Sequence, residues 1–145
     1  MNDNKYAALM LENQLCFPLY AASREVVKRY RPHLEPLGLT YTQYIAMMVF
    51  WEQKRCSVKE LGAKLYLDSG TLTPVLKSLE AKGFVRRYRS TEDERVLLVE
   101  VTAEGERLRD RALTVPEKVG GCVRLSPEEA KELYDLLYRL LGALE

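Results

Sequence analysis

The hydrophobic period of the chain changes at Gly83, and this change constrains the fold more than any other feature. Residues 57–65 and 68–81 place apolar side chains three or four positions apart, which predicts two short helices. After Gly83, a suitable helix terminator, "FVRRYR" and "RVLLVEV" flank the polar "STEDE" and predict an antiparallel hairpin. Two short helices followed by a hairpin form a winged helix-turn-helix, whose second helix enters the major groove of DNA while the hairpin, or wing, contacts the backbone or the minor groove.

Helix-capping residues support these boundaries. Ser57 and Glu60 have the spacing of a capping box at the start of the first short helix. Asp68 or Ser69 is the expected N-cap of the second helix. Both helices are therefore predicted to begin within this segment.

Helices are also expected on both sides of this unit. Residues 18–30 have helical spacing, and 31–38 contain two prolines and a glycine that predict a break. Thr42 is the expected N-cap of a nearly all-apolar, buried helix over 43–54. Thr102 is predicted to open a further helix with a capping box, and Pro116 to interrupt it. The predicted fold class is mainly α with a small β-hairpin wing.

The last predicted helix, over 126–145, has a broad leucine face. Ser126 is the expected N-cap, Pro127 the first helical residue and Glu129 the capping-box partner. A face of this kind, at the end of a chain of 145 residues, favours burial against a second subunit. We therefore expect a single winged-helix domain, with DNA-binding residues 41–102 and dimerisation helices in 1–40 and 103–145.

The charge distribution marks the middle third of the chain. The whole chain has a net charge of +1, but residues 54–89 carry nine basic and three acidic side chains. A local positive region of this kind favours a polyanion such as DNA. An ordinary solvated surface is the alternative that charge alone leaves open.

The predicted second helix and the wing supply the candidate DNA contacts. Hydroxyl and ammonium groups on that helix suit bases or phosphates, and Pro74 is tolerated if it lies within about the first turn. Asp93 and Arg95 lie two positions apart, so an extended wing would project them to one side, and the carboxylate would hold the arginine ready for the minor groove. An incidental ion pair in a solvated turn is the alternative. The candidate DNA-binding residues are Ser69, Thr71, Thr73, Lys77, Arg86, Asp93 and Arg95.

Cys16 lies in the apolar stretch "NQLCFPLY", where a free cysteine is most often a buried, inert side chain. Pro18 favours the first helical position, which would make Phe17 the N-cap and place Cys16 just outside the helix. The positive end of the helix dipole would there favour the thiolate, the form that attacks a peroxide. The residues thus allow either a core cysteine or a reactive one.

The motifs "LYLDSGTLTPVLKSLEAKG", the wing "DER" and "LCFPLYAASREVVKRYRP" together resemble the MarR family of winged-helix regulators, in its organic-hydroperoxide-sensing (OhrR-like) branch. The resemblance covers essentially the whole chain. It implies a homodimeric repressor that leaves a palindromic operator when Cys16 is oxidised by an organic hydroperoxide. It also implies that Tyr20, Tyr30 and Tyr41, from both subunits, hold the Cys16 thiolate, and that Cys122 of the other subunit resolves the sulfenic acid, as in two-cysteine members. Cys56 matches no role in the family and is expected to be structural.

Other features limit the alternatives. The spacing of the three cysteines, with His33 as the sole histidine, matches no zinc site, and no cofactor is implied. No signal peptide or membrane span is predicted, so we expect a cytoplasmic protein that is not an enzyme. A hydrophobic pocket expected around "LCFPLY" would favour lipid-like or aryl peroxides. Two rival functions remain: a MarR-type repressor released by a non-covalent aromatic ligand, and a thiol peroxidase.

Overall fold

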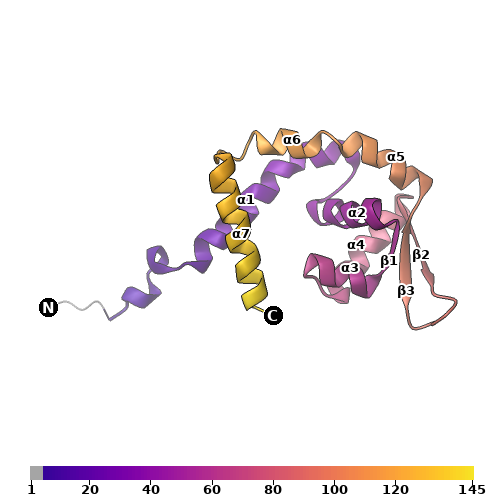
Figure 1. The fold of residues 1–145 in the computed structure, drawn as a ribbon, viewed down its shortest axis with the longest axis horizontal. Coiled ribbons are helices and arrows are strands. Elements are labelled where there is room, and N and C mark those ends of the chain that lie inside the picture. The colour runs from indigo at the N-terminus through magenta and orange to yellow at the C-terminus, as the bar shows by residue number, and fades with distance from the viewer. Residues whose placement is uncertain (1–4) are drawn as a thin grey trace.

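The computed structural model describes residues 5–145 and has the predicted class, mostly helical with a small antiparallel sheet (Figure 1). Two 3₁₀ turns, η1 and η2, precede the long helix α1, and a third, η3, follows it. The elements are η1 (Ala7–Leu9), η2 (Leu11–Asn13), α1 (Cys16–Leu34), η3 (Glu35–Leu37), α2 (Tyr41–Gln53), β1 (Arg55–Ser57), α3 (Val58–Leu65), α4 (Ser69–Ala81), β2 (Val85–Arg89), β3 (Leu97–Val101), α5 (Ala103–Ala112), α6 (Val115–Gly120) and α7 (Pro127–Ala143).

The core surrounds α2, which is buried along most of its length because nearly every side chain in it is apolar. Leu61 of α3 and Leu72 of α4 pack into the same cluster, together with Val99 of the sheet. In Figure 1 these helices and the sheet form one compact body, while α1 extends away from it and α5 and α6 arch over the top. This body is the winged helix-turn-helix. Among residues 5–145, no helix has both the length and the apolar character needed to cross a bilayer.

Two predicted helix boundaries were wrong. The break expected at 31–38 begins later, because α1 accommodates Pro32 and continues to Leu34, and the chain then turns at Gly38 with a φ of 72°. The N-cap of α2 is Thr40, not Thr42. Its hydroxyl accepts a hydrogen bond from the Gln43 N–H, and the Gln43 side chain accepts one from the Thr40 N–H.

The predicted hairpin is confirmed, and a third strand joins it. The strand order is β1-β3-β2, with Arg87 opposite Val99 and Cys56 opposite the same valine from the other side. The strand β1 was not predicted, since three residues give too short an alternation to recognise. Because β1 directly follows α2 and pairs with β3, it connects the wing to the end of α2.

The helix-turn-helix has a tight connection. Ser57 caps α3 by accepting from the Glu60 N–H, which is one half of the predicted capping box. Gly62 allows the chain to fold back after α3, because a Cβ there would lie 2.6 Å from the Leu67 carbonyl oxygen. Asp68 is the N-cap of α4. This cap confirms the predicted start of the second helix, which ends at Ala81, shortly before Gly83 adopts a left-handed φ of 82°.

The C-terminal helices follow the predicted pattern with one difference. Thr102 caps α5 through the Gly105 N–H, but a glycine at that position cannot complete the predicted capping box. Pro116 lies at the start of the separate helix α6, which confirms the interruption. Ser126 and Glu129 form the predicted capping box of α7. None of the residues of α7 is buried within the single chain.

Candidate functional site

Helix α4 presents a polar face to solvent. Ser69, Thr73 and Lys77 lie four positions apart and are exposed, while Leu72 and Leu76 lie on the opposite face in the core. The Asp68 carboxylate accepts from the Thr71 N–H at 2.7 Å, and this backbone hydrogen bond lowers the pKa of Asp68. The exposed face has the residue types and the spacing of a recognition helix.

Two details of α4 differ from the prediction. Pro74 is the sixth residue of the helix, beyond its first turn, so the Gly70 carbonyl has no N–H partner at this position. The Thr73 hydroxyl donates to the Ser69 carbonyl at 2.7 Å. In this conformation Thr73 can only accept a hydrogen bond from DNA, which favours a base amino group over a phosphate.

The wing carries the predicted pairing of Asp93 and Arg95, in a turn and not in an extended segment. The guanidinium donates to both carboxylate oxygens at 3.0 and 3.1 Å, and the Arg95 N–H donates to the same carboxylate. These hydrogen bonds lower the pKa of Asp93. The Arg95 side chain is nevertheless 89% exposed. It is an oriented cation at the tip of the wing.

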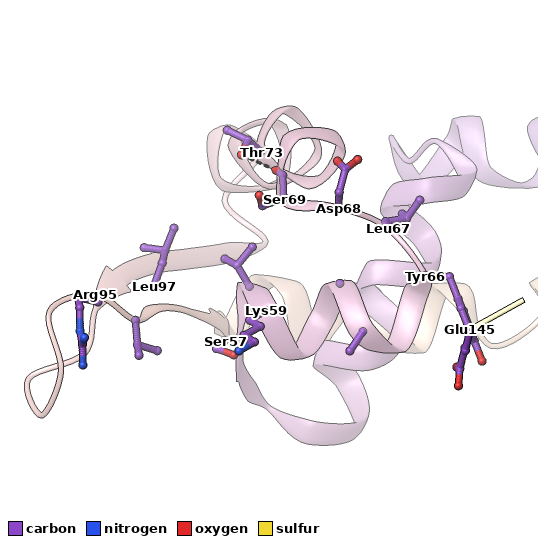
Figure 2. A pocket seen from close by; sticks show the side chains of 14 residues that line it. Ser57, Lys59, Tyr66, Leu67, Asp68, Ser69, Thr73, Arg95, Leu97 and Glu145 are labelled. Atoms are coloured by element: carbon purple, nitrogen blue, oxygen red, sulfur yellow. Dashed lines mark hydrogen bonds between the residues drawn. The ribbon is translucent and has the colours of Figure 1, made fainter. Parts of the chain in front are cut away.

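A groove of about 920 Å³ lies between α3, the start of α4 and the part of the wing near its tip, and the C-terminal Glu145 also lines it (Figure 2). It brings together three of the predicted DNA-binding residues: Ser69, Thr73 and Arg95. Lys59 of α3 also lines it, a residue that was counted in the basic segment but was not assigned to the site. A cation in the first turn of the first short helix was the signal available in the sequence.

The other predicted DNA-binding residues lie outside this groove. Thr71 and Lys77 are exposed on α4. Arg86 projects from the outer face of the sheet, where it pairs with Glu100 at 2.7 Å and lies 4.7 Å from the centre of the Tyr88 ring. A contact between Arg86 and DNA stays a prediction. A DNA phosphate would have to compete with the Glu100 carboxylate for the Arg86 guanidinium.

Most of the basic side chains in the described segment 54–89 form no ion pair with an acidic side chain. Within the described residues, three of the nine form ion pairs: Lys54 with Glu106, Arg86 with Glu100 and Arg87 with Glu80. The other six include Lys59, Lys77 and Arg89. An unneutralised basic surface is what a phosphate backbone requires.

Cys16 is the first residue of α1, with Leu15 as N-cap, so the predicted cap at Phe17 was wrong and Pro18 lies two positions inside the helix. Cys16 is exposed and is not a core side chain within the single chain. No side chain caps this helix start, so backbone N–H groups remain available beside the sulfur. Tyr20 lies one turn further on, with the Arg24 guanidinium 5.1 Å from the centre of its ring.

Tyr30 and Tyr41 form a second cluster, with ring centres 4.8 Å apart. Tyr44, which was not predicted as a site residue, packs against both. Burial raises the pKa of Tyr41 further above neutral, so its phenol keeps its proton and can donate a hydrogen bond. Cys16 and Tyr30 are about 21 Å apart along α1, since each residue advances a helix by about 1.5 Å. The cluster therefore cannot contact the sulfur of its own chain.

Cys122 and Cys56 lie in contrasting surroundings. Cys122 is exposed in the turn after α6, where its thiol lies 3.6 Å from the Lys118 carbonyl. Cys56 is buried in β1, and this burial raises its pKa to about 11, which makes it a poor nucleophile. The side chains of Leu15, Phe17 and Leu19 are exposed, so one chain alone does not enclose the hydrophobic pocket that was predicted around Cys16.

Comparison with known proteins connects this geometry to a family. Residues 28–111 match the family model of the transcriptional regulator SarA/Rot. This chain belongs to that family. It is also 47% identical over 142 residues to the organic hydroperoxide resistance transcriptional regulator of Bacillus subtilis, covering 98% of this chain and 97% of the relative. The predicted resemblance to MarR-type winged-helix regulators of the organic-hydroperoxide branch is confirmed.

Solved structures of AbfR from Staphylococcus epidermidis resemble this SarA/Rot chain along its length. Overoxidised AbfR bound to DNA has a TM-score of 0.77 at 35% identity, covering 95% of this chain and 97% of AbfR. The disulfide-formed AbfR has a TM-score of 0.63 at 34% identity, covering 99% and 98%. The winged-helix fold of this family member is thus shared with a protein that has been captured on DNA.

In this SarA/Rot regulator, we expect Arg95→Ala to weaken operator binding about five- to hundredfold while the fold is retained, because Arg95 is exposed at the wing tip. The loss should depend on the A/T content under the wing. Asp93→Ala should have a smaller effect in the same direction, since it frees the arginine. Fluorescence anisotropy with operator duplexes at moderate salt measures both, with Glu92→Ala as the control in the same turn. Unchanged affinity in both variants would remove the wing from the interface.

Proposed function

We propose that this protein is a redox-sensing DNA-binding repressor, released from a palindromic operator when an organic hydroperoxide oxidises Cys16. One observation carries the proposal: an exposed cysteine at the start of α1, in a chain 47% identical to an organic hydroperoxide resistance regulator over nearly its full length. The recognition helix and the wing supply the contacts to DNA. Binding DNA, and not turnover of a substrate, is therefore the proposed activity.

The sensing site requires two chains. Tyr20 is one turn from Cys16 on the same helix, but Tyr30 lies about 21 Å away along α1, and Tyr41 of α2 packs against Tyr30. The family resemblance implies that tyrosine phenols hold each Cys16 thiolate. Some of these phenols must then come from the partner subunit. The exposed apolar side chains of α1 and α7 supply a surface for such a homodimer. We assign dimerisation to residues 1–40 and 103–145, and DNA binding to 41–102.

The chemistry follows from the thiolate. The Cys16 sulfur attacks the terminal oxygen of the hydroperoxide, the O–O bond breaks and an alkoxide leaves, which takes up a proton to give the alcohol. Cys16 is then a sulfenic acid. The thiolate of Cys122 from the partner attacks this sulfur, hydroxide leaves as water after protonation, and a disulfide between the subunits forms. The peroxide is reduced by two electrons, and the two thiols supply them.

The disulfide, and not oxidation of Cys16 alone, is the proposed trigger. AbfR has been captured on DNA in its overoxidised form, and a disulfide-formed AbfR is also known. This chain resembles the DNA-bound form (TM-score 0.77) more closely than the disulfide form (0.63), at nearly equal identity. Bridging requires two Cα atoms to approach within about 4.4–6.8 Å. Such a movement of Cys16 and Cys122 would change the spacing of the two recognition helices, which an operator fixes at about 34–36 Å.

Operator binding with and without an organic hydroperoxide tests this proposal. We expect cumene hydroperoxide to release the reduced wild-type protein, a thiol reductant to restore binding, and hydrogen peroxide to act less effectively. A non-covalent aromatic acid, added without peroxide, should release nothing. Release by that acid with all thiols intact would favour the ligand-responsive alternative, and peroxide consumption without DNA binding would favour a thiol peroxidase.

The role of Cys122 is tested separately. Cys122→Ser should still lose its Cys16 thiol to peroxide, but it should run as a single chain on a non-reducing gel, where oxidised wild type runs as a covalent dimer. Its Cys16 should persist as sulfenic acid, proceed to sulfinic acid or be capped by an added small thiol. We also expect it to stay on the operator at peroxide doses that release the wild type. Identical single-chain bands and identical release in both proteins would show that Cys122 has no part in sensing.

A further inference from the structure

A buried glutamine links the start of α2 to the recognition helix. The Gln43 residue is 6% exposed, and its side-chain amide contacts both the N-cap of its own helix and the recognition helix. Its Nε2 donates to the Ser78 hydroxyl of α4 at 2.9 Å, and its Oε1 accepts from the Thr40 N–H at 3.0 Å. The amide thus joins the cap of α2 to the last turn of the recognition helix.

Lys82, directly after α4, strengthens the same link. Its Nζ donates to the Gln43 Oε1 at 3.1 Å and also to the carbonyl of Gly38, in the loop before α2. The end of α4 and the loop between α1 and α2 are therefore held by one shared ammonium group. Ser78, Lys82, Gln43, Thr40 and Gly38 form a connected network, which we call the α2–α4 network.

The α2–α4 network lies next to the second tyrosine cluster. Tyr41 is the residue between the cap Thr40 and the rest of α2, and its ring packs on Tyr30. A displacement of Tyr41 moves Thr40 and the first turn of α2, which carry the contacts to Gln43. Apolar packing between α2 and α4 is non-directional, whereas the hydrogen bonds of Gln43 depend on the relative position of the two helices. A buried amide that loses its partners is costly, so the network resists a change in which α2 moves without α4.

We propose that Gln43 is a positioning residue that transmits movement at Tyr41 to the recognition helix. This inference rests on the proposed function, in which Tyr41 supports the Cys16 thiolate of the partner. In the reduced state the network holds α4 in register with α2. When disulfide formation displaces the tyrosine cluster, the same hydrogen bonds pull α4 along, and DNA contact is lost.

The test compares operator affinity in the reduced state and in the fully disulfide-linked state. The variants are Gln43→Met, which keeps side-chain length without the amide, and Ser78→Ala, with Gln53→Met as the control for the same substitution at the far end of α2. We expect the affinity lost on oxidation to be about five- to tenfold smaller in both variants than in the wild type. The control should match the wild type, and the double variant should resemble either single one.

The ratio of reduced to oxidised affinity is the informative readout, because a purely structural role would lower both affinities together and leave their ratio unchanged. A wild-type ratio in Ser78→Ala and Gln43→Met, with the disulfide complete on a non-reducing gel, would overturn the inference. If Gln43→Met fails to fold, Ser78→Ala decides alone, since alanine suits a helix at this half-exposed position. If the wild type itself keeps its operator affinity after oxidation, the proposed function fails instead.

Discussion

Replacing Cys16 with serine is expected to abolish the response to organic hydroperoxides while leaving operator binding intact. A serine hydroxyl cannot form the sulfenic acid, and neither of the other cysteines can substitute for it. Cys56 is buried with a pKa raised to about 11, and Cys122 lies in a turn, without the phenols that we propose support the Cys16 thiolate. Operator binding should stay near the wild-type value, because Cys16 lies at the start of α1, which extends away from the recognition helix and the wing (Figure 1).

Anisotropy with labelled operator, before and after cumene hydroperoxide, measures this effect. Cys56→Ala is the matched control, since it removes a thiol from the buried face of β1 and should keep the full response. Release of Cys16→Ser at the peroxide dose that releases the wild type would exclude Cys16 as the sensor.

Disrupting the exposed face of α7 is expected to have the second large effect. Leu136 is 59% exposed in the single chain, and Leu140 lies four positions further on the same face. Burying two new carboxylates in a subunit interface without partners costs several kcal/mol. The variant Leu136→Glu with Leu140→Glu should therefore raise the dimer dissociation constant by at least about a hundredfold. Operator affinity should fall with it, because each half of a palindrome then binds a separate chain.

Analytical ultracentrifugation at micromolar concentration measures the dimer, and anisotropy measures the operator. Arg139→Glu introduces a carboxylate on another side of the same helix and should leave both values near the wild type. A wild-type protein that sediments as one chain under conditions of DNA binding would contradict the proposed dimer, whatever the variants do.

The fold was largely predictable because its elements have strong local signals. The change of period at Gly83 and the caps at Ser57, Asp68 and Ser126 depend on backbone chemistry within a few residues, and all are present in the structure. The errors also have local causes. Thr40 and Thr42 are both plausible caps, and the Gly38 turn decides between them. Strand β1 forms through pairing with β3, some forty residues away, which local periodicity does not encode.

The candidate site was less predictable because its parts meet through tertiary structure. Tyr20, Tyr30 and Tyr41 were predicted to support one thiolate, but more than two turns of α1 separate Tyr20 from Tyr30, against which Tyr41 packs. Lys59 faces the groove only because α3 and the wing pack side by side around it. Gln43 gave no signal at all, since its partners Ser78 and Lys82 are more than thirty residues away.

The central claim is that a disulfide between Cys16 and Cys122 controls DNA occupancy. Its most direct test is a titration of the operator-bound wild type with substoichiometric organic hydroperoxide. In the same samples, anisotropy measures the fraction of protein released from the operator, and non-reducing intact mass measures the fraction that is disulfide-linked. We predict that the two fractions rise together and that a thiol reductant reverses both. Release while Cys16 and Cys122 remain thiols, or a complete disulfide on protein that stays bound to the operator, would contradict the account.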